Sequence, residues 1–276
     1  IVEMATRLLP AADSELVDLL LDTLRKEGLR IMTGAKAATV RREDGGVSLG
    51  IEGTDGRREE IRAARLLVAV GRKPDLEGLA PEKAGVLVNA RGIVTDDYLR
   101  TTARNIFACG DVAGPYQLAS TAEAQGIVAA TNAFSPLKRK VDYRNNVYVI
   151  FTDPPLAYLG LTEDEARKKI GKKADVSRFD YGTMRRALID GNETGLAKVV
   201  CDGRGRVAGA HILGEGAPEV IHEFQVLKAL NKPLQKLHGV THAYPTYAQA
   251  LVGRASQLAF LDRMSRNFFV NAALTV

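Results

Sequence analysis

The chain has 276 residues, 46% of them hydrophobic, and a formal net charge of +5 at pH 7. It is long enough for one to three domains with a sizeable core, and no run approaches 18 consecutive apolar residues, which excludes a membrane-spanning helix. The densest basic runs, at 138–140 and 167–173, are short and lack interleaved aromatic residues, so they predict solvated surface and no nucleic-acid interface.

The two cysteines are far apart in the sequence, which excludes a CxxC redox pair and any metal-ligand spacing. Cys109 and Cys201 each lie in an apolar, strand-like run, where a free cysteine commonly behaves as a small buried hydrophobe. No signal segment opens the chain. We therefore expect a cytoplasmic protein with two buried thiols and no metal site.

The first predicted element after residues 1–10 is a helix. Asp13 or Ser14 can cap it, a stripe of leucines follows at helical spacing, and Gly28 ends it. Apolar and alternating runs separated by glycine-rich turns then predict strands at 29–43, 46–53 and 58–71. This order of elements indicates an α/β unit with a parallel sheet whose faces are covered.

A break at 71–75 leads to a second segment that ends near residue 140. An apolar strand is predicted up to Gly110; Asp111 follows it, and a helix begins near Leu118–Ala119. In open α/β sheets ligands bind at the carboxyl ends of strands, where a carboxylate can accept hydrogen bonds from sugar-like hydroxyls and a helix N-terminus favours negative charge. Taken alone, a Gly-Asp pair after a strand is equally compatible with a plain turn.

From residue 141 the pattern changes to strands flanked by separate helices. A helix opens with the capping box Thr162–Glu165, two apolar runs form a hairpin over 195–214, and an amphipathic helix covers 219–230. The last helix opens at 241–251 with a second capping box, Thr246 and Gln249. These elements predict an α+β domain.

Six segments together resemble the pyridine nucleotide-disulfide oxidoreductases, the family of dihydrolipoyl dehydrogenase, glutathione reductase and mercuric reductase. The segment at 101–114 resembles the family's second flavin fingerprint, and the others follow in the family's order along the whole chain. They lie at 1–10, 66–75, 151–167, 195–214 and 242–251.

The resemblance implies three parts and assigns cofactor-binding residues. The parts are the C-terminal portion of an NAD(P)-binding domain at 1–73, the C-terminal portion of an FAD-binding domain at 74–140, and a dimerisation domain at 141–276 that forms a homodimer. Asp111 would bind the flavin ribityl chain, and the backbone at Leu118 and Ala119 would face the flavin pyrimidine edge. Glu3 would accept hydrogen bonds from the adenine ribose, which favours NADH over NADPH, although Arg7 nearby weakens that preference. Gly71 would lie beside the nicotinamide, where only glycine lets the backbone approach closely.

Three family features have no counterpart in the sequence: a GxGxxG motif for the flavin, a redox cysteine pair and a second GxGxxG for the nicotinamide. We therefore expect the chain to be the C-terminal portion of a flavoenzyme, starting midway through its nicotinamide domain. As an isolated chain it is expected to bind neither cofactor fully and to be inactive.

The family's catalytic histidine and its partner glutamate correspond here to Tyr244 and Gln249. A phenol loses its proton near pH 10, so it does not exchange protons at neutral pH as imidazole does. Mercuric reductase has a tyrosine near this position, but it also has a C-terminal cysteine pair that residues 266–276 lack. His211, His222 and His242 are expected to be structural.

The sequence thus predicts part of an FAD-dependent NAD(P)H oxidoreductase that resembles mercuric reductase, lacks the usual dyad and reduces a small-molecule electron acceptor. Two alternatives stay open. One is a disulfide reductase with an altered acid/base; the other is a dimerisation module that has no activity when isolated.

Overall fold

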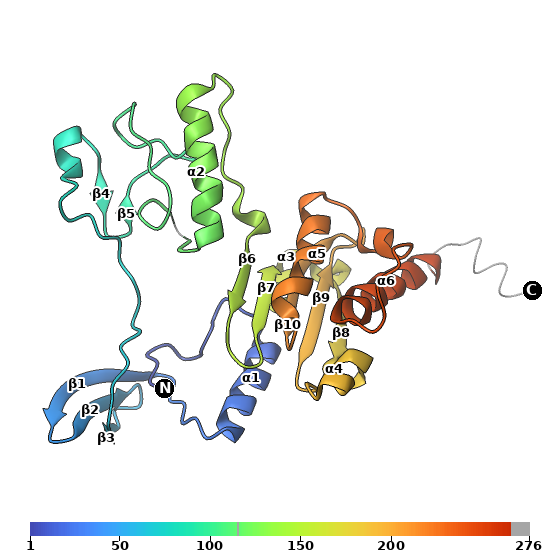
Figure 1. Ribbon diagram of the computed structural model, residues 1–276, viewed down its shortest axis with the longest axis horizontal. Helices are drawn as coiled ribbons and strands as arrows, with labels where there is room; N and C mark the ends of the chain where they lie inside the picture. Colours follow the sequence, from blue (N-terminus) through green and yellow to red (C-terminus); the bar gives the residue numbers. More distant parts are fainter. Residues whose placement is uncertain (115, 266–276) are drawn as a thin grey trace, which may run out of the picture. The chain divides into compact units, whose positions relative to one another are not determined.

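The computed structural model describes residues 1–114 and 116–265, and these form two compact units (Figure 1). One unit contains Ile1–Leu66 together with the chain from Asn145 onward, and the other is Leu67–Arg144. The tail at 266–276, whose lack of cysteines bears on the resemblance to mercuric reductase, lies outside the described residues.

The first helix, α1 (Ser14–Lys26), begins and ends where the sequence predicts. Asp13 is its N-cap and accepts a hydrogen bond from the Glu15 amide, and Gly28 follows its end at a φ of 95°. Its buried apolar residues are Leu16, Val17, Leu20 and Leu21. The leucine stripe therefore packs inward, as expected.

A three-stranded antiparallel sheet follows α1, with the strand order β1-β2-β3. Its strands are β1 (Ala35–Glu43), β2 (Gly46–Gly53) and β3 (Arg58–Ala63). The third predicted strand continues to residue 71, but β3 ends at Ala63, and Leu67 and Val70 beyond it are 89% and 91% exposed.

No parallel sheet is present among the described residues, which corrects the expected parallel architecture. All strand pairs in the described sheets are antiparallel, and the one parallel contact there is an isolated bridge between Val2 and Met32. The physical reason is that a strand of a parallel sheet needs a neighbouring strand to pair with, and the run at 66–70 pairs with no strand among the described residues.

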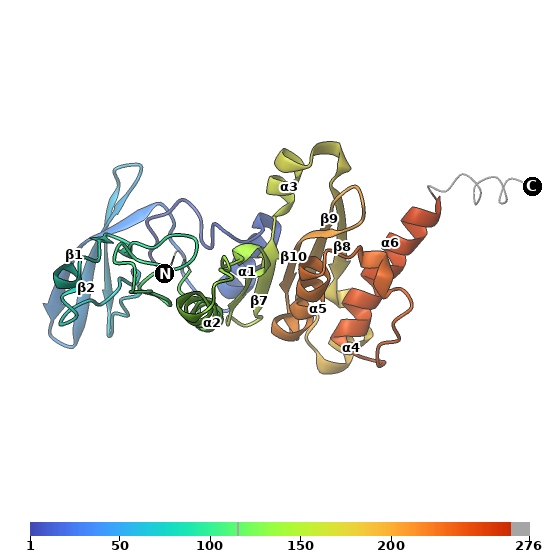
Figure 2. The same cartoon turned by 90° about the horizontal axis from the view of Figure 1, so that it is seen from above.

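The first unit also contains a five-stranded antiparallel sheet with the order β6-β7-β10-β9-β8, of which Figure 2 labels β7, β10, β9 and β8. The strands are β6 (Val147–Ile150), β7 (Leu156–Gly160), β8 (Asp175–Asp180), β9 (Leu196–Cys201) and β10 (Val207–Leu213). The predicted hairpin is β9–β10. Because side chains alternate across a strand, Ile212 packs with Phe224 and Leu251 on one face, while Leu213 packs with Leu16 on the other.

The helices of this unit cover the five-stranded sheet. Besides α1, they are α3 (Glu163–Lys169), α4 (Arg185–Asp190), α5 (Ala217–Ala229) and α6 (Arg254–Ser265). Short 3-10 turns connect them: Gly171–Lys173, Tyr181–Thr183 and Leu234–Leu237. The capping box of α3 and the buried face of α5 are confirmed. No described helix is both long and apolar enough to cross a membrane.

A buried lysine joins α1 to the five-stranded sheet. Lys198 on β9 is 3% exposed, and its Nζ lies 2.8 Å from Asp13, 2.6 Å from Glu15 and 2.9 Å from Glu163. Arg178 on β8 also pairs with Glu15 and Glu163. Because these carboxylates come from α1 and the start of α3, the cluster connects residues 13–15 to an element 185 positions later in the sequence.

The second unit, Leu67–Arg144, contains one long helix, α2 (Ala119–Phe134), and a short hairpin of β4 (Val88–Asn89) and β5 (Gly92–Ile93). A 3-10 turn at Pro81–Ala84 precedes the hairpin, and another at Tyr143–Asn145 ends the unit. The start of α2 is where the sequence predicts it. The predicted strand before Gly110 is absent, because its described backbone forms only the isolated bridge Arg100–Phe107.

The two cysteines differ in environment. Cys201 is buried in β9, and burial raises the pKa of its thiol to about 12, as befits an inert core cysteine. Cys109 is exposed. The prediction of a buried Cys109 was therefore wrong, because the segment before Gly110 does not pair as a strand.

Candidate functional site

The turn that carries Asp111 lies beside the first turns of α2, within the second unit. Gly110 has a φ of 80°, and a Cβ built there would lie 3.6 Å from the Ala122 side chain. Leu118 is the N-cap of α2, and no side chain caps the helix. The structure thus brings the predicted carboxylate turn and the predicted helix start together, at a helix end whose backbone donors point outward.

Gln125, which the sequence reasoning missed, connects this turn to α2. It is fully buried; its Oε1 accepts the Gly110 amide at 2.7 Å, and its Nε2 donates to the Tyr143 hydroxyl at 2.8 Å. The sequence did contain a signal for this contact, because Gln125 is a polar residue among the small residues of a helix face. The Gln125 amide oxygen thus holds the backbone immediately before Asp111, while its nitrogen holds Tyr143.

Gly71 and Arg72 lie in the same unit as Asp111. Gly71 has a φ of 123°, a conformation that favours glycine, and open space surrounds the position of an added Cβ. The Arg72 guanidinium is 3.8 Å from the Asp111 carboxylate, and both side chains are exposed. Such an exposed pair is weak, so the Asp111 carboxylate remains available to a ligand.

Glu3 lies in the other unit, next to the bridge between Val2 and Met32. Its Oε1 accepts a hydrogen bond from the Ala5 amide at 2.7 Å, which holds the carboxylate over its own backbone. The Nη2 atom of Arg7 is buried and has no hydrogen-bond partner among the described residues. The predicted opening strand is therefore reduced to an isolated bridge, followed by an acid and a guanidinium with one nitrogen unpaired within the described part of the chain.

Tyr244 and Gln249 belong to the start of the last helical segment. The Tyr244 side chain is exposed, with 68% of the residue accessible, whereas Gln249 is half-buried. The Thr246 hydroxyl accepts the Gln249 amide at 3.1 Å, which confirms one half of the predicted capping box. The following turn, Gln249–Gly253, is a π-helix, so Leu251 and Ala255 turn inward while Leu258 stays half exposed.

A histidine–carboxylate pair does exist near Tyr244, but it uses other residues. His242 Nε2 is 3.0 Å from Glu223 Oε2 on α5, and only 10% of the His242 side chain is exposed. His211 is buried, with Nε2 3.0 Å from the Leu161 carbonyl, and burial lowers its pKa. His222 Nδ1 contacts Gln225 on the same helix. The structural interpretation of His211 and His222 agrees with these contacts.

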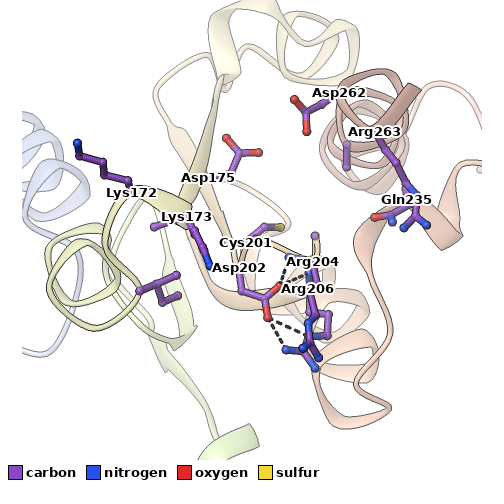
Figure 3. A pocket seen from close by; sticks show the side chains of 15 residues that line it. Lys172, Lys173, Asp175, Cys201, Asp202, Arg204, Arg206, Gln235, Asp262 and Arg263 are labelled. Carbon is purple, nitrogen blue, oxygen red and sulfur yellow. Dashed lines mark hydrogen bonds and ion pairs between the residues drawn. The ribbon is translucent and has the colours of Figure 1, made fainter. Parts of the chain in front are cut away.

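A cavity of about 900 Å³ is lined by none of the predicted site residues (Figure 3). Charged side chains of both signs line it, among them Lys173, Asp202, Arg206 and Arg263. Asp202 pairs with Arg206 at 2.7 Å, and Lys172 points away from the hollow. Across the residues described here, no group of three His, Cys, Asp or Glu side chains could hold a metal ion.

The residues around α2 fit the flavin that the sequence resemblance implies. The helix has no side-chain cap, so its first amides can donate to a carbonyl edge, and the exposed Asp111 carboxylate can accept hydrogen bonds from hydroxyls.

Comparison with known proteins gives two family matches. Residues 1–126 match the family described as pyridine nucleotide-disulphide oxidoreductase, and residues 147–255 match the dimerisation domain of that family.

Individual relatives agree with these matches. The chain is 37% identical to a dihydrolipoyl dehydrogenase of Thermus scotoductus, covering 94% of this chain and 56% of the relative, and 34% identical to a mercuric reductase of Bacillus cereus, covering 91% and 40%. It therefore spans about half the length of the curated relatives it matches. Among solved structures, the Cu(II) complex of the HOCl-induced flavoprotein disulfide reductase RclA from Escherichia coli has a TM-score of 0.85 at 28% identity, covering 92% of this chain and 57% of that one. LpdA from Mycobacterium tuberculosis has a TM-score of 0.82 at 26% identity, covering 92% and 55%.

Proposed function

Because this chain belongs to the pyridine nucleotide-disulphide oxidoreductase family, we propose that it forms the C-terminal part of an FAD-dependent NAD(P)H oxidoreductase whose electron acceptor needs no His–Glu dyad. Its parts would be the nicotinamide-domain portion at 1–73, the flavin-domain portion at 74–140 and the dimerisation domain at 141–276. A cytoplasmic setting belongs to the proposal, since both cysteines are free thiols.

The observation that carries the proposal is the pair of residues at the acid/base position. Tyr244 presents an exposed phenol, and Gln249 is held through its backbone by Thr246. Neither side chain can act as a histidine and its carboxylate do, because a phenol lacks the two ring nitrogens of imidazole and an amide carries no charge. An acceptor that takes electrons without a proton from this site is therefore favoured.

Five residues would hold the cofactors. Asp111 would accept hydrogen bonds from the flavin ribityl chain, and the amides at Leu118 and Ala119 would face its pyrimidine edge. Glu3 would hold the adenine ribose of NADH, and Gly71 would give room beside the nicotinamide. When bound, the flavin accepts hydride from the nicotinamide and passes electrons onward.

We propose that the electron acceptor is small, and specifically that it is a metal ion. The name of one relative, a mercuric reductase, points in this direction. RclA is named a disulfide reductase, and its solved structure is a Cu(II) complex. A metal ion gains electrons without the protonation of a leaving thiolate that a disulfide requires, which agrees with the replacement of the dyad.

Anaerobic titration of the full-length protein with NADH tests the proposed cofactors. Full bleaching of the bound flavin by one equivalent of NADH, with NADPH reacting more slowly, is the expected result. Absence of bound flavin, or a flavin that neither nucleotide reduces, would contradict the proposal.

A second candidate is a disulfide reductase that has relocated its acid/base pair. The contact of 3.0 Å between His242 Nε2 and Glu223 Oε2 favours it, because an imidazole hydrogen-bonded to a carboxylate is the arrangement that proton transfer to a thiolate needs. One variant distinguishes the two candidate functions. His242→Gln should abolish disulfide turnover if the pair is catalytic and should leave metal-ion turnover intact.

The isolated chain is expected to purify without colour. The Asp111 turn and the α2 N-terminus can hold only one part of a flavin, and the sequence has no glycine-rich motif for its diphosphate. An absorption spectrum of the purified chain checks this. Stoichiometric flavin absorbance would show that residues 1–276 contain the principal binding site.

We expect the chain to form a homodimer through residues 141–276. Large apolar side chains stay exposed along α5 and α6, at Val226, Leu230, Leu258 and Leu261. Obligate dimers bury such faces against each other. Light scattering at micromolar concentration should give twice the chain mass, and the double variant Val226→Glu with Leu230→Glu should give a folded monomer. A monomeric unaltered chain would contradict the assignment.

A further inference from the structure

The polar face of α2 carries two fully buried amide side chains, Gln125 and Asn132, two turns apart. A buried amide costs free energy unless its donors and acceptors are paired, so each marks a place where the helix holds another segment. Asn132 donates to the carbonyls of Tyr98 and Arg139 and accepts the Arg139 amide. Gln125 instead holds the turn that carries Asp111.

We propose that Gln125 is a positioning residue for the flavin site, acting through the backbone of Gly110. This inference rests on the proposed flavin-binding role of Asp111. The contact between Gln125 Oε1 and the Gly110 amide is 2.7 Å and is shielded from water, so it fixes the peptide plane one residue before the carboxylate.

Two further contacts orient the glutamine itself. Its Nε2 donates to the Tyr143 hydroxyl, which leaves Oε1 as the atom that faces the Gly110 amide. Across the turn, a Cβ at Gly114 would lie 2.8 Å from Nε2, so the backbone closes tightly over the side chain. Gln125 thus contacts both ends of the segment 110–114 from one position on α2.

Because the same helix also supplies the uncapped N-terminus at Leu118, Gln125 couples the two predicted flavin contacts. The carboxylate of Asp111 and the first amides of α2 keep one mutual geometry only while this side chain holds the turn. Loss of the contact would leave both groups present and the site misaligned.

The test compares Gln125→Met with Asn132→Leu in the full-length protein and in this chain. Gln125→Met keeps the side-chain length and removes both hydrogen bonds; it should weaken flavin binding about tenfold, the consequence of one lost buried hydrogen bond. Asn132→Leu removes three buried hydrogen bonds from the same helix, against two in Gln125→Met, so it controls for destabilisation; flavin affinity of its folded fraction should be unchanged. Gln125→Glu keeps an acceptor for Gly110 and should restore most of the affinity.

Amide hydrogen exchange in the 276-residue chain gives a readout that needs no flavin. The Gly110 amide should exchange at least about tenfold faster in Gln125→Met than in the unaltered chain and stay protected in Asn132→Leu. Equal flavin loss in both variants, or unchanged Gly110 exchange in Gln125→Met, would overturn the positioning role. The full-length protein could bind no flavin while Gln125 still protects the Gly110 amide from exchange. In that case the proposed function is wrong, and the role of Gln125 toward flavin is wrong with it. The hydrogen bond between Gln125 and Gly110 would still be confirmed.

Discussion

Replacing Tyr244 by histidine and Gln249 by glutamate in the full-length protein is expected to raise its disulfide reductase turnover by about 10²–10⁴-fold, the usual contribution of general acid/base catalysis. The exposed Tyr244 site can accept an imidazole without disturbing the core. Thr246 holds residue 249 through its backbone amide, which the change to glutamate leaves in place.

Three variants separate this gain from side effects. Gln249→Glu alone should give no increase, because a carboxylate without imidazole cannot exchange the proton. Tyr244→Phe removes only the hydroxyl and should likewise leave disulfide turnover low. A double variant that folds, binds flavin and still reduces no disulfide would show that the chain lacks more than the dyad.

Replacing Lys198 by methionine should lower the free energy of unfolding of the chain by about 3–5 kcal/mol, the range measured when one partner of a buried ion pair is removed. Methionine fills a similar volume, so the loss comes from charge. Asp13 is 2% exposed, and without Lys198 its carboxylate keeps, among the described residues, the Glu163 and Glu15 amides as donors. Chemical denaturation of the two proteins measures the difference.

Neutralising the Asp13 carboxylate, which Lys198→Met leaves without its cation, should recover part of the lost free energy of unfolding. Asparagine caps a helix about as well as aspartate does, so Lys198→Met with Asp13→Asn should be more stable than Lys198→Met alone. Arg30→Met is the surface control, because Arg30 and Glu59 form an exposed pair that contributes at most about 1 kcal/mol. A Lys198→Met variant as stable as Arg30→Met would contradict a stabilising role for the cluster.

Acid titration gives an independent check on the same cluster. Burial would raise the pKa of Glu163, but hydrogen bonds from Lys198 and Arg167 lower it from 4.5 to about 2. A carboxyl group with a lowered folded pKa stabilises the protein above its unfolded value and loses that contribution as the pH falls towards the folded value. Stability should therefore decline between pH 4.5 and about 2, and Lys198→Met should flatten that decline.

Local signals in the sequence predicted the elements whose partners are close in the chain. The α1 cap at Asp13, the capping box of α3, the β9–β10 hairpin and the start of α2 each depend on residues within a few positions of one another. Helix caps and hairpins carry their own chemistry, so periodicity and turn residues suffice to locate them.

Features that depend on distant partners were missed or mistaken. The runs at 66–70 and 105–109 have the composition of buried strands, but a strand exists only when another strand pairs with it, and these runs pair with none in the described chain. Lys198 appears in sequence as an ordinary charge within an apolar strand, and only the fold brings Asp13 beside it. The pair His242–Glu223 likewise joins two elements that sequence spacing does not relate.

The most direct measurement is NADH oxidation by the full-length, flavin-loaded protein, assayed side by side with a small disulfide and with Cu(II) and Hg(II) ions as acceptors. We predict turnover with a metal ion at least about 100-fold above turnover with the disulfide, the lower bound for a missing acid/base contribution, and the same metal-ion rate in His242→Gln. Disulfide turnover equal to or above metal-ion turnover, abolished by His242→Gln, would contradict the account and establish the disulfide reductase in its place.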